Sequence, residues 1–109
     1  MNGYVQVLTT VSSEEEARRI CDALVEDRLA ACVQVAGPVS STYRWQGKVE
    51  REREWQCLAK TEARLYDEVE AAIRRLHSYD EPEILAIPVL AGSRGYLDWV
   101  SAQVRDEPG

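Results

Sequence analysis

Two long strand-like stretches on either side of a tight turn constrain this 109-residue chain more than any other feature. Side chains alternate with a period of two over 39–45 and 48–61, and Gln46-Gly47 between them predicts a hairpin turn. Strands in globular proteins are usually about 5–6 residues long, so the tip of this hairpin should project beyond the sheet of so small a domain. A projecting ribbon needs support, and we expect another copy of the chain to supply it.

The other segments show their structure in their periodicity and turn residues. The expected elements, in chain order, are a strand at 4–11, a helix that begins at a capping box of Ser12 and Ser13 with Glu15 and Glu16 and ends near Asp27, strand residues from Cys32 into the hairpin, a helix at 65–76, a strand at 83–90 and a short helix capped by Ser93. Gly37-Pro38 predicts a bend or bulge, and Pro88 predicts an edge strand or bulge because proline cannot donate a ladder hydrogen bond.

The order of these elements predicts the fold class. Strand, helix, two strands, helix and strand form the α+β, ferredoxin-like βαββαβ arrangement, here with an added C-terminal helix. In this arrangement two helices cover one face of a four-stranded antiparallel sheet. The length fits a single domain over residues 1–109. The fold is shared by proteins of many functions, so it does not define the function.

The charge balance argues against nucleic acid as a partner. Thirteen Lys and Arg side chains against nineteen Asp and Glu give a formal net charge of −6 and a pI near 4.8. Phosphate backbones are bound mainly by cationic side chains, which this chain lacks in excess. We therefore expect no nucleic-acid binding, and the aromatic side chains of the hairpin fit an oligomer interface better than a base-stacking platform.

Hydropathy and cysteine content bear on location. The sequence has no apolar run of 18 residues, so no membrane span is expected. No basic and apolar leader precedes the first predicted strand, and the three cysteines fit neither a disulfide framework nor a closed zinc site. We expect a cytoplasmic protein.

A polar stretch at 77–83 is the strongest candidate site. It joins the only histidine, His77, to a phenol and three carboxylates. Imidazole and carboxylate together ligate Cu²⁺, Zn²⁺ or Ni²⁺, and the affinity order favours Cu²⁺. The alternative is that His77 caps the end of the preceding helix as a cation and the acids are solvated. With one histidine and no recognised nucleophile motif, the chain is not expected to be an enzyme.

The cysteines are candidate ligands of a different kind. Cys32 and Cys57 lie in strands of the same hairpin, where thiolates would suit Cu⁺, although plain core packing is the alternative. Cys21 falls on the apolar stripe of its helix and is expected to be a small buried hydrophobe without a chemical role.

Several short motifs together resemble the CutA family of divalent-cation tolerance proteins. They are Ala30-Ala31-Cys32-Val33, Ser41-Thr42-Tyr43-Arg44-Trp45-Gln46-Gly47-Lys48, Lys60-Thr61, His77-x-Tyr79-x-x-Pro82-Glu83-Ile84 and Tyr96-Leu97-x-Trp99. The resemblance implies a ferredoxin-like subunit in a homotrimer with the architecture of the trimeric PII signalling proteins. It also implies a link to copper and other divalent metals. The chain departs from the usual family pattern at Gln34, Ser78 and Asp80.

These observations and the resemblance lead to one main hypothesis. We expect a non-enzymatic homotrimer that binds a divalent metal, with Cu²⁺ the favoured ion and His77, Glu83 and Cys32 as metal ligands. By the resemblance, Lys60 and Tyr79 fall on motif positions of the family and are expected to contact a bound cofactor or ligand. A PII-like regulatory module that holds a small anionic ligand in clefts between subunits is the alternative, and an enzyme that uses His77 and Glu83 as acid and base is a third.

Overall fold

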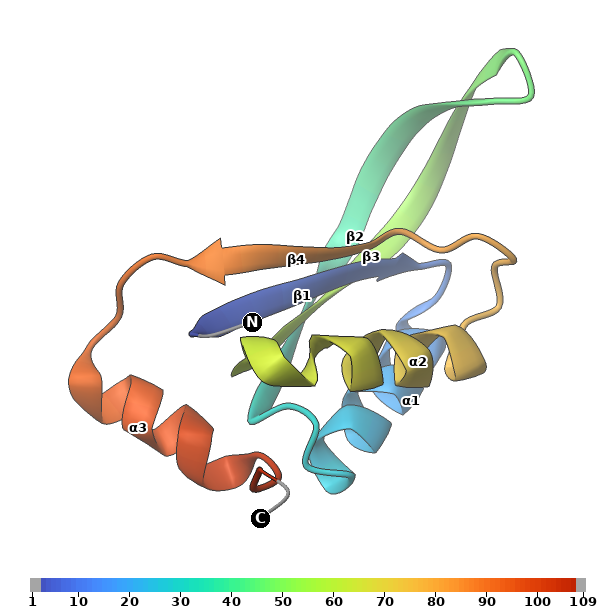
Figure 1. Ribbon diagram of the computed structural model, residues 1–109. Coiled ribbons are helices and arrows are strands. Elements are labelled where there is room, and N and C mark those ends of the chain that lie inside the picture. Colours follow the sequence, from blue (N-terminus) through green and yellow to red (C-terminus); the bar gives the residue numbers. More distant parts are fainter. Residues whose placement is uncertain (1–2, 108–109) are drawn as a thin grey trace.

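The computed structural model describes residues 3–107 of the chain (Figure 1). Its elements, in order, are β1 (Tyr4–Val11), α1 (Glu14–Glu26), β2 (Cys32–Trp45), β3 (Lys48–Glu62), the short 3-10 turn η1 (Ala63–Leu65), α2 (Tyr66–Leu76), β4 (Ile84–Val89) and α3 (Arg94–Gln103). Every predicted element is present, and the bounds differ from those expected by a few residues at most.

The four strands form one antiparallel sheet in the order β2-β3-β1-β4. Helices α1 and α2 cover one face of it (Figure 1), which confirms the α+β, ferredoxin-like arrangement. Strand β4 lies at an edge of the sheet, and its Pro88 stands opposite Val5 of β1. Proline has no backbone N–H to donate, and an edge strand has a neighbour on one side only, so the missing donor is tolerated there. No helix within residues 3–107 is long and apolar enough to cross a membrane.

The hairpin of β2 and β3 projects beyond the rest of the sheet (Figure 1), as its length predicts. The molecule measures 47 × 26 × 22 Å along its principal axes, and the hairpin accounts for the long one. The pairing register shifts between Ala36 and Val39, so the expected irregularity at Gly37-Pro38 is present. The ring of Trp45, at the tip, is 57% exposed in the single chain.

The core lies between the sheet and the helices. Alternate residues of β1 point into it, and they meet apolar side chains of α1 and α2: Val5, Val7, Val11, Ile20, Leu24, Val69 and Ile73 are all buried. The first turn of α1 differs from the expected capping box. Ser13 accepts a hydrogen bond of 3.1 Å from the Glu16 N–H, but the Glu16 carboxylate bonds a distant segment instead of returning to the cap.

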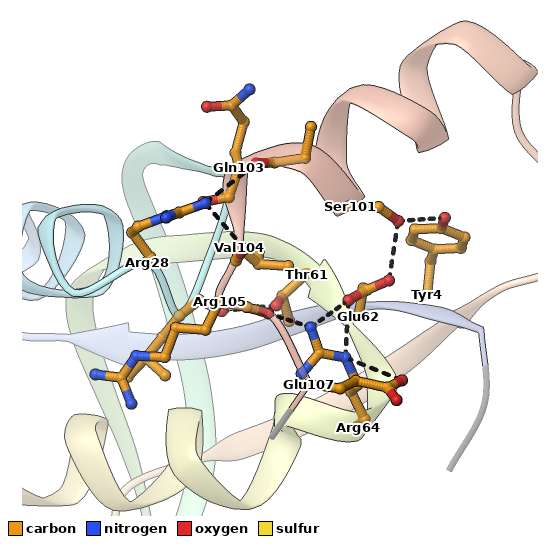
Figure 2. Close-up of polar contacts among 12 residues, drawn as sticks. Tyr4, Arg28, Thr61, Glu62, Arg64, Ser101, Gln103, Val104, Arg105 and Glu107 are labelled. Carbon is orange, nitrogen blue, oxygen red and sulfur yellow. Dashed lines mark hydrogen bonds and ion pairs between the residues drawn. The ribbon is translucent and has the colours of Figure 1, made fainter. Parts of the chain in front are cut away.

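Polar contacts hold α3 against the far end of the sheet (Figure 2). The Arg28 guanidinium donates to the carbonyl oxygens of Ala102, Gln103 and Val104, which are free at the end of the helix. Ser93 occupies the N-cap position as expected, but its hydroxyl makes no capping hydrogen bond in the described part of the chain.

A second group of contacts links α3 to β1 and β3 (Figure 2). Tyr4 and Ser101 share a hydrogen bond of 2.6 Å, and Ser101 donates to Glu62 at 2.9 Å. Arg64 lies 2.7 Å from the same Glu62 carboxylate. These contacts lie at the end of the molecule opposite the hairpin tip, whereas the candidate site lies beside the hairpin.

Candidate metal-binding cavity

A cavity of about 610 Å³ opens between the hairpin and the segment that joins α2 to β4. Its lining residues are Thr10, Ser41, Thr42, Tyr43, Trp45, Glu54, Tyr79, Asp80, Glu81 and Glu83. The expected residues Tyr79 and Glu83 therefore lie at one site, and residues of the hairpin form the wall that faces them.

Four carboxylates line this cavity and no Lys or Arg side chain joins them among its described lining residues. Asp80, Glu81 and Glu83 come from the segment before β4, whereas Glu54 comes from β3 and is only 8% exposed. Glu81 is partly neutralised by Arg74, 3.4 Å away. Like charges gathered in a partly enclosed space repel one another, and a bound cation relieves that repulsion.

Tyr79 joins the two walls of the cavity. Its phenol donates a hydrogen bond of 3.0 Å to Glu54. Burial, and after it this bond to a carboxylate, raises the pKa of Tyr79 above its usual value. The phenol therefore stays protonated at neutral pH and acts as a donor to Glu54.

His77 lies behind the cavity wall and its side chain is fully buried. Nδ1 accepts a hydrogen bond of 3.1 Å from the Tyr79 N–H, and Nε2 lies 2.8 Å from the carbonyl oxygen of Thr10. A carbonyl oxygen can only accept, so Nε2 donates to Thr10, and Nδ1 also lies 3.5 Å from a carboxylate oxygen of Glu16. Both nitrogens are engaged, so a metal could bind His77 only after one of these bonds had opened. His77 occupies the C-cap position of α2, as the alternative interpretation held.

Glu16 fixes the same segment from the other side, and sequence reasoning missed it. Its carboxylate accepts two hydrogen bonds of 2.9 Å, one from the N–H and one from the hydroxyl of Ser78. The sequence did hold a signal, because Glu16 shares a stripe with Ile20 and Leu24 at i, i+4 and i+8. A carboxylate on the buried face of a helix implies a specific partner.

Cys32 and Lys60 lie elsewhere on the hairpin. They stand opposite each other at its base, where Lys60 donates to the side-chain oxygen of Gln34. Lys60 is six residues along β3 from Glu54, or roughly 20 Å at the usual rise of a strand. Within one chain the structure therefore does not bring Cys32 or Lys60 to the cavity of Glu83 and Tyr79.

Cys32 and Cys57 also do not meet. Cys32 pairs with Lys60 whereas Cys57 pairs with Val35, and the odd separation of Cys32 from Val35 places the two thiols on opposite faces of the sheet. Among residues 3–107, no three or more His, Cys, Asp or Glu side chains converge closely enough to enclose a metal ion.

Fold and cavity together define a class: small ferredoxin-like α+β proteins in which a long hairpin bounds an acid-lined cavity. A family model described as "CutA1 divalent ion tolerance protein" matches residues 5–103. The chain therefore belongs to the CutA1 divalent ion tolerance protein family, as its motifs indicated.

Individual relatives agree with this assignment. The divalent-cation tolerance protein CutA of Thermus thermophilus is 48% identical over 94 residues, which cover 86% of this chain and 91% of the relative. A solved structure of the Thermus thermophilus divalent cation tolerance protein superimposes with a TM-score of 0.91 at 44% identity and covers 94% of this chain and 99% of its own. The Archaeoglobus fulgidus structure, named a periplasmic divalent cation tolerance protein CutA, gives a TM-score of 0.91 at 37% identity with the same coverage.

Proposed function

We propose that this chain binds a divalent cation, with Cu²⁺ preferred, through the acidic cavity, and that it acts without catalysis in tolerance to such ions. The observation that supports the proposal is the gathering of Glu54, Asp80, Glu81 and Glu83 on one cavity without a basic side chain among its described lining residues. The same acidic lining disfavours an anionic ligand, so this cavity does not support the alternative of a regulatory module that binds a small anion.

The donor chemistry fits a divalent cation held in an open site. Carboxylate oxygens bind divalent ions, and among first-row ions the affinity order places Cu²⁺ highest. One chain supplies no closed set of three ligands within residues 3–107, so water completes the shell or a neighbouring subunit contributes to it. His77 then serves chiefly to position the segment: the ring holds Tyr79 and Thr10 in place beside Glu83.

A homotrimer is the assembly we propose. On the sheet face that α1 and α2 leave uncovered, Leu85 and Ile87 of β4 are 52% and 41% exposed, and Trp45 is exposed at the hairpin tip. Exposed apolar surface of this kind marks protein interfaces. In such an assembly Cys32 and Lys60 of a neighbouring subunit could approach the cavity, which gives these residues a role in the proposed site. We also propose a cytoplasmic location, although at least one relative is named a periplasmic protein.

Equilibrium dialysis against Cu²⁺, Zn²⁺ and Mg²⁺, with calorimetry for the affinity, tests the cavity. We expect Cu²⁺ to bind most tightly, and Glu83→Gln or Asp80→Asn to weaken it by at least about tenfold, as the loss of a metal contact does. Glu15→Gln is the matched control, because Glu15 is an exposed carboxylate of α1 outside the cavity.

Two results would contradict the proposal. If the cavity variants bind Cu²⁺ as tightly as Glu15→Gln does, the carboxylates are not ligands. If a nucleotide or another small anion binds where Cu²⁺ does not, and Lys60→Ala abolishes that binding, the regulatory-module alternative is correct. Turnover in an activity screen that His77→Ala removes would favour the enzyme alternative.

A further inference from the structure

The projecting hairpin sorts its charged side chains by face. Successive side chains of a strand point to opposite faces, so Glu50, Glu52 and Glu54 share one face of β3. Arg51 and Arg53 fall on the other face. Every second residue in this part of β3 therefore adds a carboxylate to one face, about 6.6 Å farther along the strand each time. We call this side of the hairpin its acidic face.

The acidic face continues the wall of the acidic cavity. Glu54 lines the cavity, and so does Tyr43, which stands opposite Glu50 and therefore shares its face. Ser41, which stands opposite Glu52, lines the cavity too. The carboxylates thus run from the cavity along the part of the hairpin that projects beyond the sheet (Figure 1).

Most of these carboxylates have no cationic partner among residues 3–107. Glu81 pairs with Arg74, but the other acids of the cavity and of the acidic face make no ion pair there: Glu50, Glu52, Glu54, Asp80 and Glu83. Glu54 is only 8% exposed, and one of its two oxygens accepts the phenol of Tyr79, whereas the other accepts no hydrogen bond from the described residues. A buried carboxylate is ordinarily paired. The unpaired oxygen of Glu54 therefore indicates a ligand that brings positive charge.

The acids are spread too widely for one metal ion to pair with all of them. Within residues 3–107, no three His, Cys, Asp or Glu side chains come together closely enough to hold a metal ion. The cavity measures about 610 Å³, inside the range of about 300–1,000 Å³ that is usual for sites of organic ligands. A longer cation, whose charges are separated by apolar segments, can reach carboxylates on both walls and on the acidic face.

Aromatic rings supply apolar surface between these acids. Tyr43 of the hairpin and Tyr79 of the segment before β4 both line the cavity, one on each wall. Methylene groups pack on aromatic rings, and an ammonium group over the face of a ring gains a cation–π attraction. Carboxylates interspersed with aromatic surface match a methylene chain that carries amines at intervals.

We propose that the acidic cavity and the acidic face bind a linear aliphatic polyamine, a cation of the spermidine class. The amines of such a ligand are protonated at neutral pH, as the lysine side chain is. One ammonium group pairs with the buried carboxylate of Glu54. The rest of the ligand follows the acidic face past Tyr43, so that further ammonium groups meet Glu52 and Glu50. This inference goes beyond the proposed function, since it names a second class of ligand that competes with a divalent cation for the cavity.

The test is isothermal titration calorimetry of the full chain with spermidine at about 0.15 M salt, which screens exposed charges farther apart than about 8 Å. Putrescine and propylamine, which carry fewer amines, complete the ligand series. Wild type should bind spermidine most tightly and propylamine least, because each added ammonium group meets another carboxylate. Equal affinity for spermidine and propylamine would overturn the proposal.

Three variants locate the bound polyamine. Glu54→Gln keeps an acceptor for Tyr79 and should weaken spermidine binding by at least about tenfold, as loss of a bond between buried charged groups does. Glu52→Gln, on the exposed part of the acidic face, should weaken it roughly two- to fivefold. Tyr43→Leu removes a ring without changing charge and should also cost roughly two- to fivefold. Glu15→Gln, an exposed carboxylate of α1, is the matched control and should bind as wild type does.

Separate titrations with Cu²⁺ distinguish this inference from the proposed function. Glu52→Gln and Tyr43→Leu should leave Cu²⁺ binding unchanged, because neither residue is a proposed metal ligand. Circular dichroism checks the fold of Glu54→Gln, and if that variant unfolds, the exposed Glu52→Gln decides alone. Failure of wild type to bind spermidine would overturn this inference, as would equal affinity in wild type and Glu52→Gln, and Cu²⁺ binding that Glu83→Gln weakens would still support the proposed function. Spermidine binding without Cu²⁺ binding would support this inference and refute the proposed function.

Discussion

Tyr79 donates a hydrogen bond of 3.0 Å to Glu54, and this bond ties the segment after α2 to the projecting hairpin. Both residues line the acidic cavity. The phenol competes with any cation for the lone pairs of Glu54, because a carboxylate oxygen that ligates a metal has fewer of them to accept hydrogen bonds. Tyr79 therefore influences both the stability of the hairpin base and the affinity of the cavity.

The first prediction concerns alkaline pH. Because the pKa of Tyr79 is raised in the folded chain, the unfolded chain releases this proton first as pH rises. The contribution of Tyr79 to the free energy of unfolding should be complete below about pH 10, the ordinary value for tyrosine, and should be lost as pH rises through the folded value. Urea unfolding of wild type and Tyr79→Phe across this range measures the effect.

Tyr79→Phe should reduce the slope of the free energy of unfolding against pH in this alkaline range, without abolishing it. The pKa values of Tyr43 and Tyr66 are raised as well, in both cases mainly by loss of solvent, so they act in the same direction. Identical slopes in wild type and Tyr79→Phe would contradict the assignment. The same variant should bind a divalent cation at least as well as wild type, since Glu54 is then released from the phenol.

The second prediction concerns the buried carboxylate of Glu16. Glu16→Ala removes the acceptor of two hydrogen bonds from Ser78, and bonds to a charged group contribute about 1.5–3 kcal/mol each, so we expect a loss of roughly 3–6 kcal/mol in the free energy of unfolding. Ser78→Ala keeps the backbone bond and should cost about 1.5–3 kcal/mol. Glu15→Ala, on the exposed side of the same helix turn, should change stability by less than about 0.5 kcal/mol. Equal losses in Glu15→Ala and Glu16→Ala would show that the Ser78 contacts contribute nothing.

Local patterns predicted the fold because each element carries its own signal. The hairpin follows from alternation around Gln46-Gly47, and the helices follow from apolar stripes, so their bounds could be placed to within a few residues. The edge position of β4 followed from Pro88, whose backbone cannot donate.

The site was less accessible to such reasoning because it depends on contacts between distant residues. Glu16 and Ser78 are 62 positions apart, and Glu54 and Tyr79 are 25 positions apart. Residue type suggested that the 77–83 segment was polar and functional, but nothing local showed that both ring nitrogens of His77 would take part in hydrogen bonds. That outcome depends on how the segment after α2 packs against the end of β1.

The third prediction concerns assembly. If the chain forms the proposed trimer, sedimentation equilibrium without added ligand should give three times the chain mass, and the melting temperature should rise with protein concentration. Trp45→Ala should weaken assembly by roughly 2 kcal/mol or more, as loss of an interface anchor does. The ring is mostly exposed in the single chain, so the subunit fold should survive.

Val25→Ala, which alters an exposed apolar residue of α1, is a control for a general loss of surface hydrophobicity. A single-chain mass at micromolar concentration would refute the trimer. A reversible melting temperature that does not change with concentration would refute the coupling of folding to assembly.

The fourth prediction uses the close approach of Gly37 to Trp55. A Cβ atom at Gly37 would lie 2.7 Å from Cδ1 of the Trp55 ring and 3.1 Å from its backbone Cα, both closer than ordinary contact. The ring cannot move away freely, because it packs against the core and Arg53 lies over it at 5.9 Å. Gly37→Ala should therefore destabilise the chain by roughly 1–3 kcal/mol, the usual cost of overpacking.

Gly95 in α3 provides the control, because a Cβ atom there would meet nothing within 4 Å. Gly95→Ala should stabilise the chain by up to about 1 kcal/mol, since alanine favours helix. Urea unfolding measures both variants, with Trp55 fluorescence as a local report in a background that carries Trp45→Phe and Trp99→Phe, because the chain has three tryptophans. If Gly37→Ala proves as stable as wild type with an unchanged Trp55 signal, the hairpin base is looser than this contact implies, and the wall of the acidic cavity that β2 and β3 form is then adaptable instead of fixed.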